Sequence, residues 1–253
     1  MPGGIVGAVQ EFPPRCRDDA VTKHSRVWVR ARREAGLSAL LAIQVAIMFV
    51  LAPFSATGGL QPVAIELARF ALGAVAVLTV TRSRPIIALI ASTFVASLVL
   101  SVVFRTGGAG TAIGLARLFL ITAFDVVVAV AVARVAFGPG RVTVHRIMGG
   151  VILYLSVGLI FAEVYRAAAL TLHPSFSGLP TSGRSTLSEL LYFSLSTLTT
   201  SGFGDITPLH PFIRSMANLE AVIGQLFPAT LLARLVTLHA AKANGDGSPD
   251  DGD

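Results

Sequence analysis

Long apolar runs alternate with short polar connections along most of the chain, and the connections are rich in Gly, Pro, Ser and Thr. A helix needs about 20 apolar residues to cross a hydrocarbon core of roughly 30 Å. Run length therefore predicts membrane-spanning helices. The first five of these lie near residues 37–54, 63–80, 85–104, 112–137 and 147–170.

The stretch from Ser185 to Arg234 has a different pattern, because a short segment precedes the last long apolar run. Residues 185–199 predict a short amphipathic helix. A turn punctuated by Gly202 and Gly204 follows, and the apolar run after it is long enough for a sixth span. The pattern therefore predicts an all-α membrane protein with six transmembrane helices.

Composition supports a membrane location for most of the chain. Hydrophobic residues make up 53% and charged residues 13%, whereas an ordinary soluble domain carries about 25% charged residues. The net charge of +6 comes from basic residues that flank the apolar runs, so we expect no nucleic-acid partner. The single cysteine, Cys16, excludes an intrachain disulfide and a cysteine-based metal site. No metal-ligand cluster, nucleophile–base pair or phosphate loop stands out, so the sequence predicts neither an enzyme nor a cofactor.

The basic residues also predict the orientation, because cytoplasmic loops carry an excess of Lys and Arg. We therefore expect a multi-pass protein of the cell (plasma or inner) membrane, with both termini in the cytoplasm and the glycine turn on the outer side. In this orientation the cytoplasmic connections hold Arg82, Arg84, Arg141, Arg146 and Lys242, and the outer ones hold Arg105 and Arg184.

The two ends of the chain are polar. Residues 1–36 are basic and lack an early apolar core, so we expect a cytoplasmic segment without a cleavable signal peptide. Within it, residues 22–34 suit either a surface helix anchored by Trp28 or, as we favour, a flexible tail. Residues 241–253 form an acidic tail that we expect to be disordered.

The glycine turn carries the most specific chemistry. Glycines at positions 202 and 204 let the backbone take conformations that a Cβ disfavours. Successive carbonyls can then point the same way, toward a shared axis. Four such strands would stack rings of oxygens that replace the water around a dehydrated cation. The turn therefore predicts an ion-selectivity filter.

The sequence Thr200-Ser201-Gly202-Phe203-Gly204-Asp205 resembles the Thr-Val-Gly-Tyr/Phe-Gly-Asp signature of pore-loop potassium channels. The resemblance extends over roughly residues 147 to 238, with an aromatic pair before the motif and Gly224 in the usual place of the gating glycine. It departs from the family at Ser201. The resemblance implies a re-entrant pore helix and filter loop between the fifth and sixth spans, a homotetramer embedded in lipid, and passive, selective conduction of K⁺.

The resemblance also assigns roles to individual residues. Potassium would be bound through oxygens of Thr200, Ser201, Gly202 and Phe203, and Gly204 would complete the selectivity filter. The filter would be supported from behind by Tyr192, Phe193, Ser196, Thr199 and Asp205.

The family carboxylate that Asp205 matches hydrogen-bonds behind the filter to a pore-helix aromatic NH, often alongside an acidic residue. Phe193 and Ser196 are taken to occupy those positions. Because Phe193 has no donor, we expect only the Ser196 hydroxyl, or water, to answer Asp205.

On the sixth helix, Pro228 cannot donate the hydrogen bond that the Gly224 carbonyl would accept. This pair predicts either a gating hinge or a bend fixed by packing. Below the filter, Gln225, Leu232 and Val236 would line the pore, and the two apolar residues could form a dewetting constriction.

Ionisable residues inside spans are costly and are usually paired or functional. Glu66 with Arg69, and Glu163 with Arg166, stand three apart and can meet on one helix face. Two further acids, Asp125 and Glu220, have no such neighbour. A voltage sensor needs several basic residues at every third position, and the fourth span offers only Arg117 and Arg134.

We therefore expect a four-helix transmembrane domain without a charged sensor over residues 37–137 and a pore domain over 138–240. Besides the potassium channel, three alternatives remain. Ser201 motivates a weakly selective cation channel on the same fold. A non-conducting membrane module would use the loop only as a turn. A potassium transporter usually chains several pore-loop units, whereas this chain has one.

Overall fold

The computed structural model describes residues 36–57, 62–79, 84–106, 110–137, 144–179 and 187–245. The predicted basic segment, including the surface helix near Trp28, lies outside these residues except for Gly36. Within them the chain is helical apart from the connections and one pair of two-residue strands, which confirms the all-α prediction.

Each apolar run of the sequence coincides with a helix. The first helix covers Gly36–Ala56 and contains the π-helical segment η1 (Ile47–Leu51) and α2 (Ala52–Ala56). The others are α3 (Pro62–Thr79), α4 (Arg84–Thr106), α5 (Thr111–Ala136), α6 (Val144–Thr171), the short α7 (Leu187–Leu198) and α8 (Pro211–Gly245).

Length and hydropathy single out four helices of the described chain that can cross a membrane: Gly36–Ala56, Thr111–Arg134, Arg146–Thr171 and Pro211–Ala233. The apolar parts of α3 and α4 are shorter, at Leu67–Ala76 and Ile87–Val103. The protein is therefore a multi-pass membrane protein, and α3 and α4 are helices as predicted, with shorter apolar stretches among the residues whose side chains are described.

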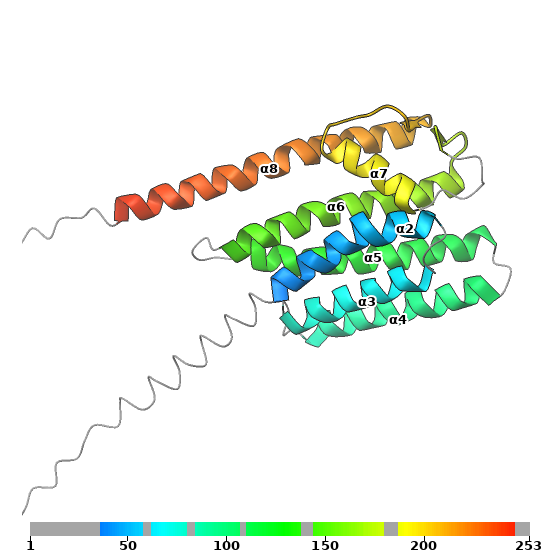
Figure 1. Ribbon diagram of the computed structural model, residues 1–253, viewed down its shortest axis with the longest axis horizontal. Helices are drawn as coiled ribbons and strands as arrows, with labels where there is room; N and C mark the ends of the chain where they lie inside the picture. The colour runs from blue at the N-terminus through cyan, green and yellow to red at the C-terminus, as the bar shows by residue number, and fades with distance from the viewer. Residues whose placement is uncertain are drawn as a thin grey trace, which may run out of the picture.

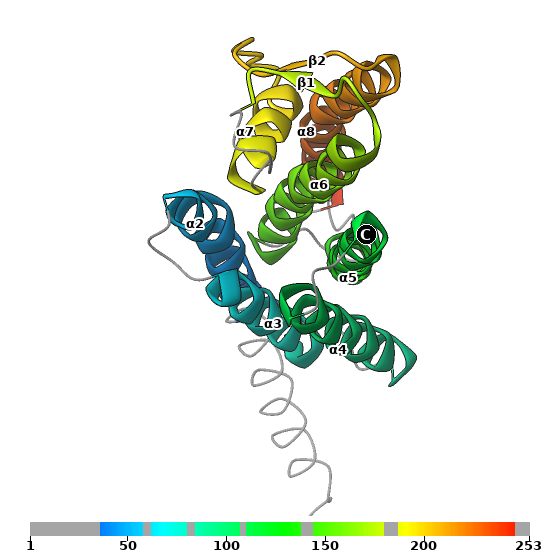
Figure 2. The same ribbon diagram turned by 90° about the vertical axis from the view of Figure 1, so that its right-hand side faces the viewer.

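The helices form a bundle in which α6 occupies the middle. Figure 2, which looks along the helices, shows α3 and α4 on one side of the α5–α6 pair and α7 with α8 on the other. The end of the first helix packs against α7, where Met48 and Ala52 meet Leu187 and Leu191. The four-helix part and the short helix that precedes the glycine turn are thus in direct contact.

The last helix is a long rod that runs past the end of the bundle (Figure 1). It contains Pro228 and remains helical on both sides of it. It also continues to Gly245, so the prediction of disorder from residue 241 is wrong for residues 241–245. Ala240, Ala241 and Ala243 explain this extension, because alanine is the strongest helix former. The rest of the acidic tail lies outside the described residues.

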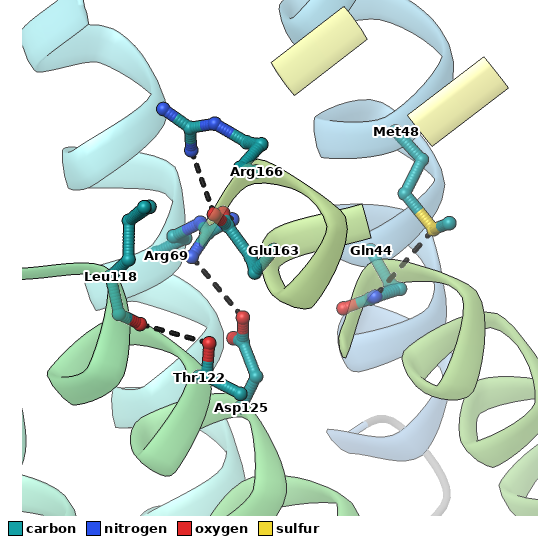
Figure 3. A network of polar contacts seen from close by, with 8 residues as sticks. All are labelled: Gln44, Met48, Arg69, Leu118, Thr122, Asp125, Glu163 and Arg166. Atoms are coloured by element: carbon teal, nitrogen blue, oxygen red, sulfur yellow. Dashed lines mark hydrogen bonds and ion pairs between the residues drawn. The ribbon is translucent and has the colours of Figure 1, made fainter. Parts of the chain in front are cut away.

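A buried cluster of charges joins α3, α5 and α6 (Figure 3). The guanidinium of Arg69 lies 3.1 Å from Asp125 Oδ2 and also bonds Glu163 Oε1. Arg166 completes the cluster with a 2.7 Å bond to the other oxygen of Glu163. Arg69, Asp125 and Glu163 are each at most 6% exposed.

This cluster confirms the predicted pair of Glu163 and Arg166 and gives Asp125, which has no basic neighbour on its own helix face, a partner on another helix. The sequence concealed that partner because Arg69 lies 56 residues away in the chain. The side chain of Glu66, predicted to pair with Arg69, lies outside the described part of the structure. Buried charges are tolerated only when they are paired, so Arg69 fixes the position of α6 against the four-helix part.

We predict that Arg69→Leu lowers the stability of the purified protein by roughly 3–5 kcal/mol, because Asp125 would remain buried without a cation and Glu163 would keep only Arg166. Arg134→Leu is the matched control, since Arg134 is exposed in the last turn of α5. Thermal unfolding in detergent measures both variants. Equal melting temperatures for the two would contradict the role given to Arg69.

Candidate functional site

The glycine turn begins where α7 ends. The amphipathic pattern of α7 buries one face, formed by Leu187, Leu190, Leu191, Phe193, Ser194, Ser196 and Leu198. Beyond Leu198 the backbone folds back on the helix, since the amide of Gly202 donates to the carbonyl of Ser196 at 3.1 Å. The C-terminal end of α7 and the turn therefore form one hydrogen-bonded unit.

The turn alternates between two kinds of backbone conformation. The φ angles are positive at Thr200 (58°), Gly202 (51°) and Gly204 (80°), but not at Ser201 or Phe203 between them. Such alternation turns successive carbonyls toward the same side of a strand, and glycine adopts positive φ without steric cost. Thr200 is the exception among the described residues with a Cβ, and a left-handed conformation there costs roughly 1–2 kcal/mol.

A hydrogen bond from α8 holds the side chain of Thr200. Gln225 Nε2 donates to Thr200 Oγ1 at 3.0 Å. The sequence predicted both residues for the ion pathway but did not predict that they would touch. The contact links Thr200, the first residue of the turn with a positive φ, to α8.

Ser201, the departure from the family motif, has a partner for its hydroxyl. Thr199 Oγ1 donates to the carbonyl of Leu195 at 2.7 Å. Ser201 Oγ lies 3.0 Å from the same Thr199 oxygen. Since the threonine hydrogen is already used, Ser201 donates to Thr199.

Tyr192 and Phe193, the aromatic pair before the turn, contact different parts of the structure. Tyr192 stacks on Phe203, with ring centroids 5.7 Å apart and ring planes within 8°. Phe193 is buried instead against Tyr165 and Phe176. The two residues face different directions because neighbouring helix positions are rotated by about 100°.

The predicted bond from Ser196 to Asp205 is wrong, and a water that binds Asp205 stays a prediction. Ser196 Oγ donates to the carbonyl of Phe193 within its own helix, at 2.9 Å.

A small strand pair fixes the far end of the turn, and the sequence analysis did not predict it. β1 (Phe176–Ser177) follows α6 and pairs antiparallel with β2 (Thr207–Pro208). Next to it, Gly178 has a φ of 83°, and a Cβ there would lie 1.9 Å from the carbonyl oxygen of Asp205. Gly178 was the only signal that the sequence offered for this close approach.

Gly224 packs against the end of α7. A Cβ at this position would lie 1.8 Å from the carbonyl oxygen of Leu198. The same oxygen accepts a hydrogen bond from the Tyr154 hydroxyl on α6, at 3.1 Å. Close approach to the α7 terminus is thus a sufficient reason for glycine here, and the gating hinge with Pro228 stays a prediction.

The remaining predicted lining residues are open to the surroundings. Leu232 and Val236 are 62% and 61% exposed. Along the same helix, large apolar side chains that are more than half exposed are Phe212, Leu219, Val222 and Leu226. In the described part of the chain, no group of three or more His, Cys, Asp or Glu could hold a metal ion.

We predict that Gly224→Ala disrupts the packing of α8 on α7, because its methyl group would overlap a backbone oxygen that cannot move aside. The matched control is Gly150→Ala on α6, where the new methyl meets only the flexible end of Leu231, at 3.0 Å. Thermal unfolding should show a fall of about 1–3 kcal/mol for the first variant and a smaller one for the second. Identical unfolding curves would show that the α7–α8 contact is not needed.

Comparison with known proteins agrees with this arrangement. Residues 147–240 match the family described as "Ion channel". A stretch of 87 residues is 36% identical to "Protein LctB" of Bacillus caldotenax, covering 33% of this chain and 64% of that protein. No solved structure matches. The matched region contains α7, the glycine turn and nearly all of α6 and α8. Residues 147–240 therefore form a pore-loop ion-channel domain of the family to which potassium channels belong.

Proposed function

We propose that the protein conducts K⁺ passively and selectively across the cell membrane through a filter formed by residues 200–204 of four identical chains. The alternating φ angles at Thr200, Gly202 and Gly204 carry this proposal. They turn consecutive carbonyls to one side, and rings of such carbonyls can replace the hydration shell of a potassium ion. Oxygens of Thr200, Ser201, Gly202 and Phe203 would bind the ion.

The number of chains follows from the number of filter strands. Each chain supplies one glycine turn, so a closed ring of carbonyls requires several copies around an axis, most simply four. The exposed apolar residues of α8 and the 69% exposed ring of Phe203 are surfaces that neighbouring copies would cover. They support self-association of this part of the chain.

The short helix α7 adds an electrostatic contribution. Its C-terminal end lies directly before Thr199 and Thr200. The macrodipole of a helix places about half a negative charge at that end. A cation at the inner mouth of the filter would be stabilised by four such ends.

The remaining predictions belong to the same proposal. We take α3 and α4 as the second and third of six spans, with their polar ends in the interfacial regions. The excess of basic residues in alternate connections supports a cytoplasmic location of both termini. Leu232 and Val236 would then form the constriction at the inner end of the pore.

We predict that Gly202→Ala reduces K⁺ flux into liposomes by at least about tenfold, because alanine at positive φ costs roughly 1–2 kcal/mol in each of four copies. Gly110→Ala is a matched control. A Cβ meets nothing within 4 Å at either glycine, but Gly110 has an ordinary φ of −62°. Only the backbone conformation therefore separates the two variants.

The flux assay decides between the channel and a non-conducting module. Wild-type protein that carries no K⁺ in liposomes, or Gly202→Ala protein that conducts like Gly110→Ala, would refute the proposed filter. Subunit stoichiometry in detergent tests the tetramer separately from conduction.

A weakly selective cation channel is the second candidate, and Ser201 favours it. Its hydroxyl donates to Thr199, where the family usually carries an apolar, branched side chain that is stiffer. We predict that Ser201→Val raises the preference for K⁺ over Na⁺ in bi-ionic reversal potentials. Coinciding reversal potentials for wild type and variant would remove this alternative.

A further inference from the structure

Glu220 lies in the middle of the α6–α7–α8 contact and is 0% exposed. It belongs to the apolar part of α8 that can cross a membrane, where an ionised carboxylate is costly unless a cation accompanies it. Within the described residues, the ion pairs join Arg69 and Arg166 to Asp125 and Glu163, and none involves Glu220. Its partners are hydroxyl groups.

Three short oxygen–oxygen contacts run through this carboxyl group. The Tyr165 hydroxyl on α6 lies 2.7 Å from Glu220 Oε2. Glu220 Oε1 contacts Ser194 Oγ on α7. Ser194 Oγ in turn lies 2.7 Å from the carbonyl oxygen of Gly158 on α6. Oxygens at such distances repel unless a hydrogen lies between them, so the three contacts need three hydrogens.

Counting the hydrogens gives the protonation state. Tyr165 supplies one and Ser194 supplies one, whereas the carbonyl of Gly158 supplies none. An ionised carboxylate would also supply none, and one contact would then lack a hydrogen. A protonated carboxyl supplies the third. The complete chain is Tyr165 to Glu220, Glu220 to Ser194, and Ser194 to Gly158.

We propose that Glu220 is a neutral carboxylic acid that positions the pore helix α7 behind the filter, accepting a hydrogen bond from α6 and donating one to α7. Its effect on conduction rests on the proposed channel function. Ser194 is fully buried and lies one turn before Leu198, where the glycine turn begins. Holding Ser194 therefore fixes the height and rotation of the helix that carries Tyr192 and leads into Thr199.

The side chains that bond Glu220 would not neutralise the negative charge of an ionised carboxylate. From α6, the phenol of Tyr165 bonds it, and α7 contributes the hydroxyl of Ser194. These groups carry no positive charge. Loss of the proton would leave Ser194 with one hydrogen for two acceptors, so alkaline solution should loosen α7 from its neighbours.

Two substitutions of Glu220 separate a neutral acid from an ionised acceptor. Glu220→Gln can still accept from Tyr165 and donate to Ser194, because its amide has both functions. We expect it to keep K⁺ flux within about twofold of wild type at neutral pH and to remove any alkaline loss of flux. Glu220→Leu leaves buried hydroxyls unsatisfied and should reduce flux about tenfold at every pH. A Glu220→Gln variant as impaired as Glu220→Leu would overturn the proposal.

Infrared spectroscopy provides a readout that does not depend on conduction. Wild-type protein in detergent at neutral pH should show the carbonyl stretch of a protonated carboxylic acid, and Glu220→Gln should lack that band. Equal bands in the two proteins would overturn the proposal. Wild-type protein that shows the Glu220 band but carries no K⁺ would refute the channel function and leave the neutral acid in place.

Ser194→Ala tests the contact if Glu220→Leu does not fold. Its matched control is Ser156→Ala on α6, since Ser156 is also buried but bonds only Ile152 of its own helix, at 2.8 Å. We expect Ser194→Ala to lower the melting temperature more than Ser156→Ala. Equal melting temperatures would contradict a positioning role for the Glu220–Ser194 contact.

Discussion

The backbone contact between Gly224 on α8 and Leu198 at the end of α7 holds the site together, and most of the surrounding geometry follows from it. A helix ends with carbonyls that lack partners within the helix. At Leu198 this oxygen accepts from Tyr154 on α6 and lies against Gly224 of α8, which has no Cβ. The three helices α6, α7 and α8 thereby meet where the glycine turn starts. This contact fixes the position of the first residue of the turn.

The molecule contains two buried polar clusters, one held by ion pairs and the other by hydrogen bonds to hydroxyl groups. Arg69, with its carboxylate partners on α5 and α6, joins the four-helix part to the pore part by ion pairs. Glu220 joins α6, α7 and α8 by hydrogen bonds to hydroxyl groups. Ion pairs tolerate little rearrangement in a low dielectric. The charged cluster thus makes α6 part of a rigid frame, against which the hydroxyl-bonded helices are placed.

The positions of the helices could be predicted because each apolar run has the length and composition of a buried helix. The partners of polar groups could not. Asp125 pairs with Arg69, which lies 56 residues away. The residues next to Asp125 in the sequence do not indicate that pairing. Whether Tyr192 or Phe193 is buried depended on the rotation of α7, which neighbouring helices determine. The β1–β2 pair was hidden for a similar reason, since strands of two residues leave no periodic pattern.

The hydrogen bond from Gln225 to Thr200 couples two regions that are often treated separately. Gln225 directly follows Gly224, so any twist or tilt of α8 near this point must carry the amide with it. Either the bond breaks or Thr200 moves, and Thr200 already has an unfavourable φ of 58°. A tilt of α8 near Gln225 therefore cannot leave both this hydrogen bond and the glycine turn unchanged.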